Sequence, residues 1–486
     1  MRSIVKTILP LILSIAATSI LQAQSILDTE RLVNATAAES DMRHGTLSVC
    51  VYNISTGQTV YSYNPDISMI PASVQKLFTT GAGFALLGSN FRFQTELKMR
   101  GTIDREGVLH GNIYIFGGGD PLLGSYRYRQ TSPDSLFDCW ASAIRKKGIR
   151  RIDGHICYNT SIFDDNPIHD SWQWGDIGNY YAAGVNGLNF HENMYFVYFN
   201  AGDRVGAPAT VSSTKPKNLD LRGSAHVSTG PVGSGDQVNI YGTPSSAERT
   251  YKGTVPLGAR AFAVRGAMPE PARTCADMFA SYLRTNGIGI SSSSEPDNTT
   301  PDSLRQLITF YSTDYYTIAQ YTNLTSNNIY AECIFKYLGF QQYGLGSFKN
   351  GAKVLTTHFY NLGLNTAGVN IEDGSGLSRL NLTTASFICQ YLKAISGESF
   401  FDDFRQSMAK VGQNGTARNM LPNLPENISI SIKTGTMKGV KAYAGYITAR
   451  NGNLLSFAII ANNFSCSETV VKEKMDNILF KIATLY

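Results

Sequence analysis

The chain has 486 residues, of which 43% are hydrophobic and 16% are charged, and it contains 45 glycines. This composition suits a globular protein of two or three domains that is rich in turns and β structure. The formal net charge of +5 falls by two, to +3, once the first 23 residues with their two basic side chains are removed. So weak a positive charge argues against a nucleic-acid partner.

Residues 1–23 have the features of a secretory signal peptide. Arg2 and Lys6 supply the positive charge, an apolar stretch from Ile8 to Leu21 follows, and Ala23 offers a small residue before a cleavage point. A membrane-anchoring helix is the alternative, but the stretch contains a proline and is short for a span, which needs roughly 20 residues. We therefore expect an exported protein of the periplasm or cell envelope.

The seven cysteines are thinly spread and show neither a CxxC pair nor the spacing of metal ligands. Their odd number leaves at least one of them unpaired within the chain. Cys139 and Cys157 are the nearest pair, and an exported chain can form a disulfide there. The alternative is that the cysteines are buried free thiols.

The N-terminal part of the mature chain predicts two strands and a helix. Apolar residues alternate between Thr46 and Asn64, with a turn at Ser55–Gly57. Pro71 then precedes a largely apolar, helix-like stretch over Ala72–Leu87. We assign this part, residues 24–90, to the first half of a domain that the C-terminal part of the chain completes.

The middle of the chain reads as an insertion that is mostly β. It is rich in glycine, tyrosine and short alternating runs. We expect two lobes, the first formed by 91–130 and 226–305 and the second, nested within it, by 131–225. A helix is expected over Ala272–Asn286, before a serine-rich linker.

The C-terminal part, 306–486, resumes a regular pattern. Isoleucines alternate with serines up to Lys433, which predicts a strand. Two more strands, joined at the hairpin signal Asn451-Gly452, and a closing amphipathic helix over Thr469–Ala483 follow. With the N-terminal strands they would form one antiparallel sheet covered by helices, among them Asn328–Leu338 and Thr384–Ala394. The fold class is α+β.

A Ser-x-x-Lys motif occurs four times, beginning at Ser3, Ser73, Ser212 and Ser407. The first lies in the signal peptide, the third runs into a proline, and the fourth sits in a polar stretch typical of a surface helix. The second follows a Pro-Ala entry to an apolar helix. Residues three apart on a helix share a face, so Lys76 can take the proton of Ser73. Backbone N–H groups at a helix start can also stabilise an oxyanion, and we assign the backbone of Ser73 to that role.

Ser326-Asn327-Asn328 is the second motif. In isolation such a run is more often a polar helix cap. As part of a site, Ser326 would relay a proton between Lys76 and the leaving group, and Asn328 would hold the substrate amide.

Lys433-Thr434-Gly435-Thr436 is the third motif, at the end of the predicted strand. Alone it could be a strand end with an exposed lysine. As part of a site, Lys433 supplies positive charge beside Ser326, and Gly435 lets a substrate backbone lie against the strand. The hydroxyls of Thr434 and Thr436 can bind a carboxylate, and the Thr436 N–H can complete the oxyanion hole.

A lysine acts as a base only when it is neutral. Desolvation and a second cation both lower the pKa of a lysine. We therefore predict that Lys433 lies close to Lys76 and lowers its pKa.

These three motifs stand in a fixed order, and two further strings accompany them, Gly117–Leu122 (GGGDPL) and Asp373–Arg379 (DGSGLSR). Over nearly all of the mature chain, the sequence resembles the class C low-molecular-mass penicillin-binding proteins, the D-alanyl-D-alanine carboxypeptidase/endopeptidases of the penicillin-binding protein 4 type. The resemblance implies a transpeptidase-like domain with two nested inserts. One departure is Gln75 in the first motif, which we expect to face away from the nucleophile.

The resemblance implies a serine-type D-Ala-D-Ala carboxypeptidase or DD-endopeptidase that acts on peptidoglycan stem peptides through an acyl-enzyme. β-Lactams would be covalent inhibitors, and no metal or cofactor is needed. A serine β-lactamase and an envelope-binding protein without catalysis are the alternatives. Asp120, held between a glycine run and Pro121, is our candidate for reading the side-chain amine of the stem's diamino acid. The alternative for Asp120 is a bond to its own turn backbone.

Overall fold

The computed structural model describes residues 24–217, 219–299 and 302–485. The predicted signal peptide lies outside the described residues, so export stays a prediction. No helix in the described part of the chain has the length and apolar character needed to cross a membrane.

The two ends of the chain form one six-stranded antiparallel sheet, in the order β16-β17-β18-β19-β1-β2. The predicted alternation produces these strands, and the predicted hairpin turn joins β18 to β19, with Gly452 at a φ of 83°. The strand bounds are β1 Thr46–Asn53, β2 Gln58–Tyr63, β16 Ala409–Lys410, β17 Ser429–Met437, β18 Val440–Thr448 and β19 Leu454–Asn462.

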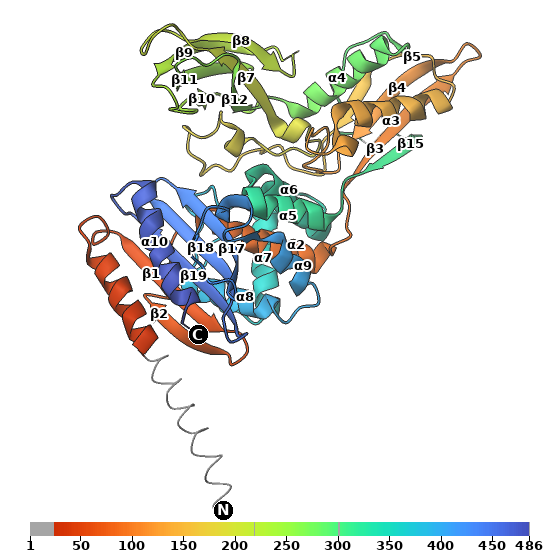
Figure 1. Cartoon of the computed structure of the whole chain (residues 1–486). Coiled ribbons are helices and arrows are strands. Elements are labelled where there is room, and N and C mark those ends of the chain that lie inside the picture. Colours follow the sequence, from red (N-terminus) through yellow and green to blue (C-terminus); the bar gives the residue numbers. More distant parts are fainter. Residues whose placement is uncertain (1–23, 218, 300–301, 486) are drawn as a thin grey trace, which may run out of the picture.

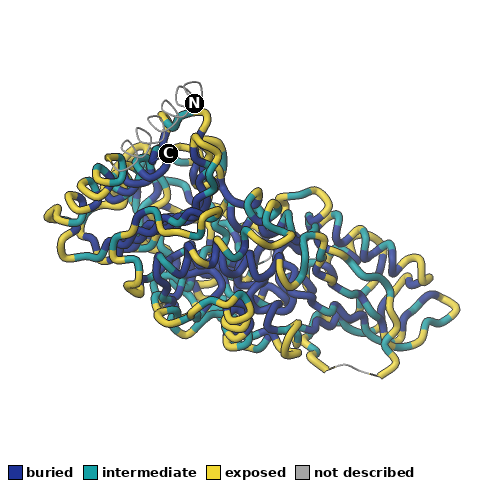
Figure 2. Tube along the Cα trace, turned by 90° about the horizontal axis from the view of Figure 1, so that it is seen from below, coloured by how far each residue is buried: buried dark blue, intermediate teal, exposed yellow. Residues whose placement is uncertain are grey.

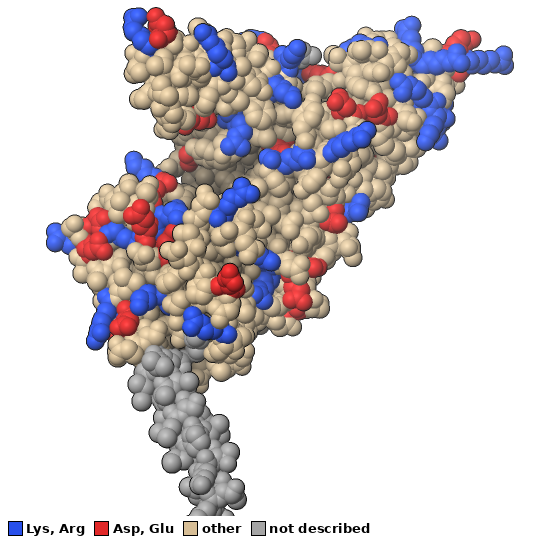
Figure 3. All heavy atoms as spheres, viewed as in Figure 1, with Lys and Arg blue, Asp and Glu red and all other residues tan. Residues whose placement is uncertain are grey.

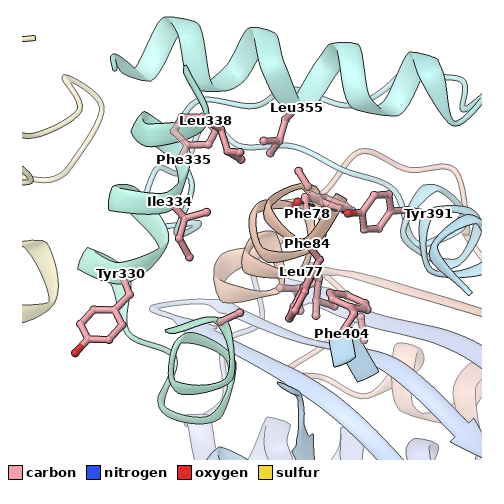
Figure 4. Packing of buried hydrophobic residues seen from close by; sticks show 14 of the residues in the cluster. Leu77, Phe78, Phe84, Tyr330, Ile334, Phe335, Leu338, Leu355, Tyr391 and Phe404 are labelled. Atoms are coloured by element: carbon pink, nitrogen blue, oxygen red, sulfur yellow. Dashed lines mark hydrogen bonds between the residues drawn. The ribbon is translucent and has the colours of Figure 1, made fainter. Parts of the chain in front are cut away.

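Helices cover both faces of this sheet (Figure 1). On one face, α2 lies at the centre of the core, where Leu77, Phe78 and Phe84 pack against the surrounding helices (Figure 4). On the other face lie α10 and the helical residues 24–38. The helix bounds are α2 Lys76–Leu87, α5 Tyr315–Thr325, α6 Asn328–Tyr343, α7 Phe348–Asn361, α8 Ala385–Ile395, α9 Phe401–Ser407 and α10 Glu468–Ala483.

The inserted part of the chain begins with a seven-stranded mixed sheet that has its own hydrophobic core. Two helices, α3 Pro133–Lys146 and α4 Pro271–Thr285, pack their apolar faces into that core. The strand bounds are β3 Gln94–Ile103, β4 Val108–Phe116, β5 Arg151–Asp153, β6 Ile156–Asn159, β13 Gly289–Ile290, β14 Glu295–Pro296 and β15 Arg305–Tyr311.

A second inserted unit, which we call the nested β unit, consists of two three-stranded sheets around a small core. Figure 1 shows it beside the first insert and above the six-stranded sheet formed by the two ends of the chain. Its strands are β7 Met194–Asn200, β8 Thr210–Lys215, β9 Arg222–Gly230, β10 Asn239–Tyr241, β11 Glu248–Pro256 and β12 Phe262–Ala267.

The strand pairing groups residues differently from the predicted boundaries. β5 and β6 pair with β4, although we had placed their residues in the nested insert 131–225. The nested β unit instead spans β7 to β12, residues 194–267. β15 pairs with β3, so the insert sheet extends to residue 311, beyond the predicted end at 305.

Two smaller expectations also change. Ser407, expected on a surface helix, is buried at the end of α9, and Lys410 lies in β16. All seven cysteines are free thiols, so Cys139 and Cys157 are not bridged. Figure 2 shows the buried trace continuing from the catalytic body into the inserts, with exposed residues along the outer turns.

Candidate active site

The nucleophile motif lies where a short 3-10 helix, Ala72–Gln75, meets the start of α2 at Lys76. This geometry keeps the two predicted side chains on one face. Lys76 Nζ lies 3.0 Å from Ser73 Oγ. Ser73 is half-buried and Lys76 is fully buried. The structure thus brings the predicted hydroxyl and amine into hydrogen-bond contact.

Two carbonyl oxygens also contact the amine of Lys76. Nζ donates to Asn328 Oδ1 at 2.6 Å and to the Ser375 backbone oxygen at 2.7 Å. The Asn328 amide is oriented by its Nδ2, which donates to the Tyr181 carbonyl at 2.7 Å. A neutral amine has two N–H groups, and these two acceptors use both of them. In this neutral form the lone pair remains for the proton of the Ser73 hydroxyl, whereas a protonated Lys76 donates to Ser73 Oγ.

Burial sets the charge state of Lys76. Desolvation lowers its pKa to about 7, while the negative charges of Glu332 and Asp373 act in the opposite direction. A pKa of about 7 leaves roughly half of the amines neutral at neutral pH. The geometry and the pKa together make Lys76 a competent base for Ser73.

The second lysine contacts the second serine. Lys433 Nζ donates to Ser326 Oγ at 2.9 Å and to the Thr434 backbone oxygen at 2.7 Å. Burial and then the charge of Lys76 lower the pKa of Lys433 well below its ordinary value.

The prediction that Lys433 lowers the pKa of Lys76 stays a prediction. Burial is the largest cause of the lowered pKa of Lys76, and the charge of Lys76 is in turn one cause of the lowered pKa of Lys433.

The turn between α5 and α6 positions the second motif. Ser326 has a left-handed φ of 58°, which ends α5. Asn327 caps α6, where its side chain accepts from the Tyr330 N–H. Asn328 is the first residue of α6. The capping role therefore falls to Asn327, while Ser326 and Asn328 face the two lysines.

Gly435 brings the third motif against the nucleophile. A Cβ at Gly435 would lie 2.8 Å from the Ser73 backbone nitrogen and 3.0 Å from the Pro71 oxygen. We expect Gly435 to let a substrate backbone lie against the strand. The structure shows a second reason for a glycine here: β17 packs so closely against the turn that carries Ser73 that no side chain fits between them. The hydroxyl of the half-buried Thr434 donates to Thr416 Oγ1 at 2.8 Å, and Oγ1 of the exposed Thr436 accepts from Lys441 Nζ at 2.9 Å.

A buried loop that begins at Asp373 supports Lys76 from behind. Glu332 accepts from the Gly374 and Ser375 N–H groups, at 2.8 Å each. This holds the Ser375 carbonyl against Lys76. Gln75, expected to face away from the nucleophile, is buried and donates to the Asp373 carbonyl at 3.2 Å.

Sequence reasoning missed the roles of Glu332 and of the Ser375 carbonyl. The signal for Glu332 was its position four residues after Asn328, on the same face of α6. Ser375 lies in the string Asp373–Arg379, and its contact with Lys76 is made by a backbone atom, which has no residue-type signal in the sequence.

Asp120 is held away from this cluster. It is 2% exposed, and its Oδ1 accepts from the Leu122 N–H at 2.8 Å. Burial raises the pKa of its carboxyl to about 7. In the described part of the chain Asp120 makes no hydrogen bond with Ser73 or Lys76. These contacts favour the alternative stated above, an aspartate that bonds its own turn.

Within residues 24–217, 219–299 and 302–485, no group of three or more His, Cys, Asp or Glu side chains is placed to hold a metal ion. The expectation that no cofactor is needed stays a prediction.

A family model described as the D-Ala-D-Ala carboxypeptidase 3 (S13) family matches residues 29–484. The chain belongs to this family. Among its relatives, a D-alanyl-D-alanine carboxypeptidase of Actinomadura sp. (strain R39) is 26% identical over 89% of this chain and 80% of the relative. The D-alanyl-D-alanine carboxypeptidase DacB of Haemophilus influenzae is 24% identical over 87% of this chain and 86% of its own length.

Solved structures show the same fold. The crystal structure of penicillin-binding protein 4 (dacB) from Haemophilus influenzae superposes with a TM-score of 0.78 at 22% identity, covering 90% of this chain and 97% of that one. The same protein complexed with a β-lactam gives a TM-score of 0.74 at 22% identity and covers 90% of this chain and 96% of that one. The S13 family member described here therefore has a penicillin-binding protein 4-like α+β fold.

Proposed function

We propose that this protein is an exported, penicillin-binding, serine-type D-Ala-D-Ala carboxypeptidase that also acts as a DD-endopeptidase on peptidoglycan stem peptides. One observation carries the proposal: the buried amine of Lys76 lies 3.0 Å from Ser73 Oγ and uses its N–H groups on two carbonyl oxygens. The family and the printed names of its relatives support the substrate class.

The first half of the reaction acylates Ser73. Its Oγ attacks the carbonyl carbon between two D-alanines while its proton passes to Lys76 Nζ. The backbone N–H groups of Ser73 and Thr436 receive the negative oxygen that develops. The C–N bond then breaks, and the proton reaches the departing amine through Ser326, whose hydroxyl Lys433 holds.

The second half releases the acyl group. A water molecule attacks the ester carbonyl and gives its proton to Lys76, and the bond from that carbon to Ser73 Oγ then breaks. Lys76 passes the proton to Ser73 Oγ, which restores the hydroxyl. Asn328 keeps one amide hydrogen for the substrate, because its oxygen is used by Lys76 and its other hydrogen by the Tyr181 carbonyl. The hydroxyls of Thr434 and Thr436 receive the terminal carboxylate of the substrate.

Fluorescent penicillin and a pentapeptide ending in D-Ala-D-Ala test this proposal. We expect a long-lived covalent label and release of D-Ala. Rapid turnover of penicillin without D-Ala release would identify a β-lactamase instead. If the protein neither formed the covalent penicillin label nor released D-Ala, the result would favour an envelope-binding protein without catalysis.

A further inference from the structure

A second recess borders the catalytic cluster at Ser326. It has a volume of about 190 Å³ and lies between the α5–α6 turn and the inserts. Figure 3 shows the surface hollowed between the nested β unit and the catalytic body. The residues that matter for its chemistry are Arg127, Tyr180, Arg265, Tyr321, Ser326 and Asn328. We call it the arginine pocket.

Arg265 gives the pocket an uncompensated positive charge. It lies on β12 and is exposed, with its guanidinium stacked 3.6 Å from the ring centroid of Tyr180. It forms no ion pair with a carboxylate of the described residues. A guanidinium whose carbon lies over an aromatic ring keeps its N–H groups free for a planar partner such as a carboxylate.

Arg127 is the second cation of the pocket. Its guanidinium lies 4.3 Å from the ring centroid of Tyr321, and its Nε contacts Glu192 Oε1 at 2.6 Å. Contact through Nε leaves the terminal nitrogens for another acceptor. Glu192 therefore orients Arg127, and two arginines against one glutamate leave an excess of one positive charge.

The backbone that carries Glu192 is strained. His191, Glu192 and Asn193 are consecutive residues with left-handed φ values of 55°, 56° and 47°. Glu192 is 4% exposed, and its Oε1 also accepts from Ser125 Oγ at 2.6 Å. Such strain persists where the surrounding structure fixes it, and it clusters at ligand sites. Here it fixes the carboxylate that aims Arg127.

The position of the pocket indicates its ligand. Its wall includes Ser326, the residue that in the proposed function passes the proton to the departing amine. The pocket therefore lies on the leaving-group side of the scissile bond. A single terminal D-alanine does not require two further arginines, whereas a cross-linked stem peptide brings additional carboxylates to that side.

We propose that the arginine pocket binds a carboxylate of the departing stem peptide and so favours cleavage of cross-links over removal of terminal D-alanine. This inference rests on the proposed function and specifies its substrate. Arg265 contacts the departing peptide and not the reacting atoms. Its loss should leave the acylation chemistry unchanged.

The test compares two substrates in Arg265→Gln. One is a dimer of two diaminopimelate-containing stem peptides cross-linked through D-alanine, and the other is the monomeric pentapeptide. We expect kcat/KM on the dimer to fall about tenfold, and both D-Ala release and penicillin acylation to stay within about twofold. Arg260→Gln is the matched control, because Arg260 is also an exposed arginine of the nested β unit and does not line the pocket.

A dimer whose acceptor-stem carboxylates are amidated tests the charge directly. The wild-type protein should cleave it about tenfold more slowly than the free-acid dimer, and Arg265→Gln should cleave both at similar rates. A double variant, Arg127→Gln with Glu192→Gln, removes the second cation without leaving a buried charge unpaired, and it should lose dimer cleavage selectively.

Equal losses on dimer and pentapeptide, or an unchanged rate on the dimer, would overturn the assignment of the pocket. Failure of the wild-type protein to bind penicillin covalently would instead overturn the proposed function. The two failures are therefore distinguishable.

Discussion

Penicillin acylation should rise with pH through an inflection near 7, because burial lowers the pKa of Lys76 to about 7 from an ordinary value of 10.5. Below the inflection the amine is protonated and has no lone pair for the Ser73 proton. The rate should then fall about tenfold per pH unit, and above the inflection it should level off. An ordinary lysine would be neutral in about one molecule in 3,000 at pH 7, so burial raises the neutral fraction by roughly a thousandfold.

The assay is the second-order rate constant for labelling by fluorescent penicillin between pH 5 and 9. Lys76→Arg keeps the positive charge but stays protonated and so supplies no lone pair, and it should lower the rate by about 10²- to 10⁴-fold. Lys433→Ala is the comparison: it should slow labelling but leave the inflection near 7, because burial is the largest cause of the lowered pKa of Lys76. An inflection that moves upward in this variant would show that the charge of Lys433 also lowers the pKa of Lys76. A flat profile, or an inflection above pH 9 in the wild-type protein, would refute the assignment of Lys76 as the base.

Three further substitutions test the site. Ser73→Ala should abolish penicillin labelling with the fold intact by circular dichroism, whereas Ser212→Ala, in an exposed strand, should label normally; the reverse pattern would move the nucleophile. Gly435→Ala should slow labelling by about tenfold or more, because its Cβ would press on the Ser73 backbone; an unchanged rate would show that β17 yields at no cost. Asp120→Asn should affect stem peptides with a free and an acetylated side-chain amine equally, since the aspartate is buried on the Leu122 N–H. If Asp120→Asn lost activity only on the peptide with the free amine, Asp120 would again be the residue that binds that amine.

The strands of the six-stranded sheet could be predicted because the residues within each strand and turn are enough to identify it. The isoleucine alternation before Lys433 and the Asn451-Gly452 turn need no distant partner to be read. The inserts lack that advantage. β4 pairs with β3 beside it but also with β5 and β6, and β15 returns from residue 305 to pair with β3. A period-two pattern indicates that a strand exists but does not indicate which strand pairs with it. For this reason the predicted boundaries of the nested insert, at 131 and 225, are wrong.

Helix α3 was not predicted, although the sequence contains the residues that typically begin a helix. Ser132 caps it, Pro133 stands at its first position and Asp134 lies in its first turn, a combination typical of helix starts. The glycine-rich and tyrosine-rich composition of the surrounding 200 or so residues was given more weight than this local signal. Composition averages over a region, and a helix of 14 residues is lost in the average.

The environment of Lys76 explains why three motifs alone do not specify the site. Its base function needs two acceptors for its N–H groups, and one of them is the backbone oxygen of Ser375, 299 residues away. A backbone carbonyl has no residue-type signature, so it can be found only from the loop that presents it. Glu332 fixes that loop but, in its ionised form, also raises the pKa of Lys76, while burial raises the pKa of Glu332 itself to about 8. The same carboxylate therefore improves the geometry of the base and weakens its neutral form, and complete burial of the amine is what offsets that second effect.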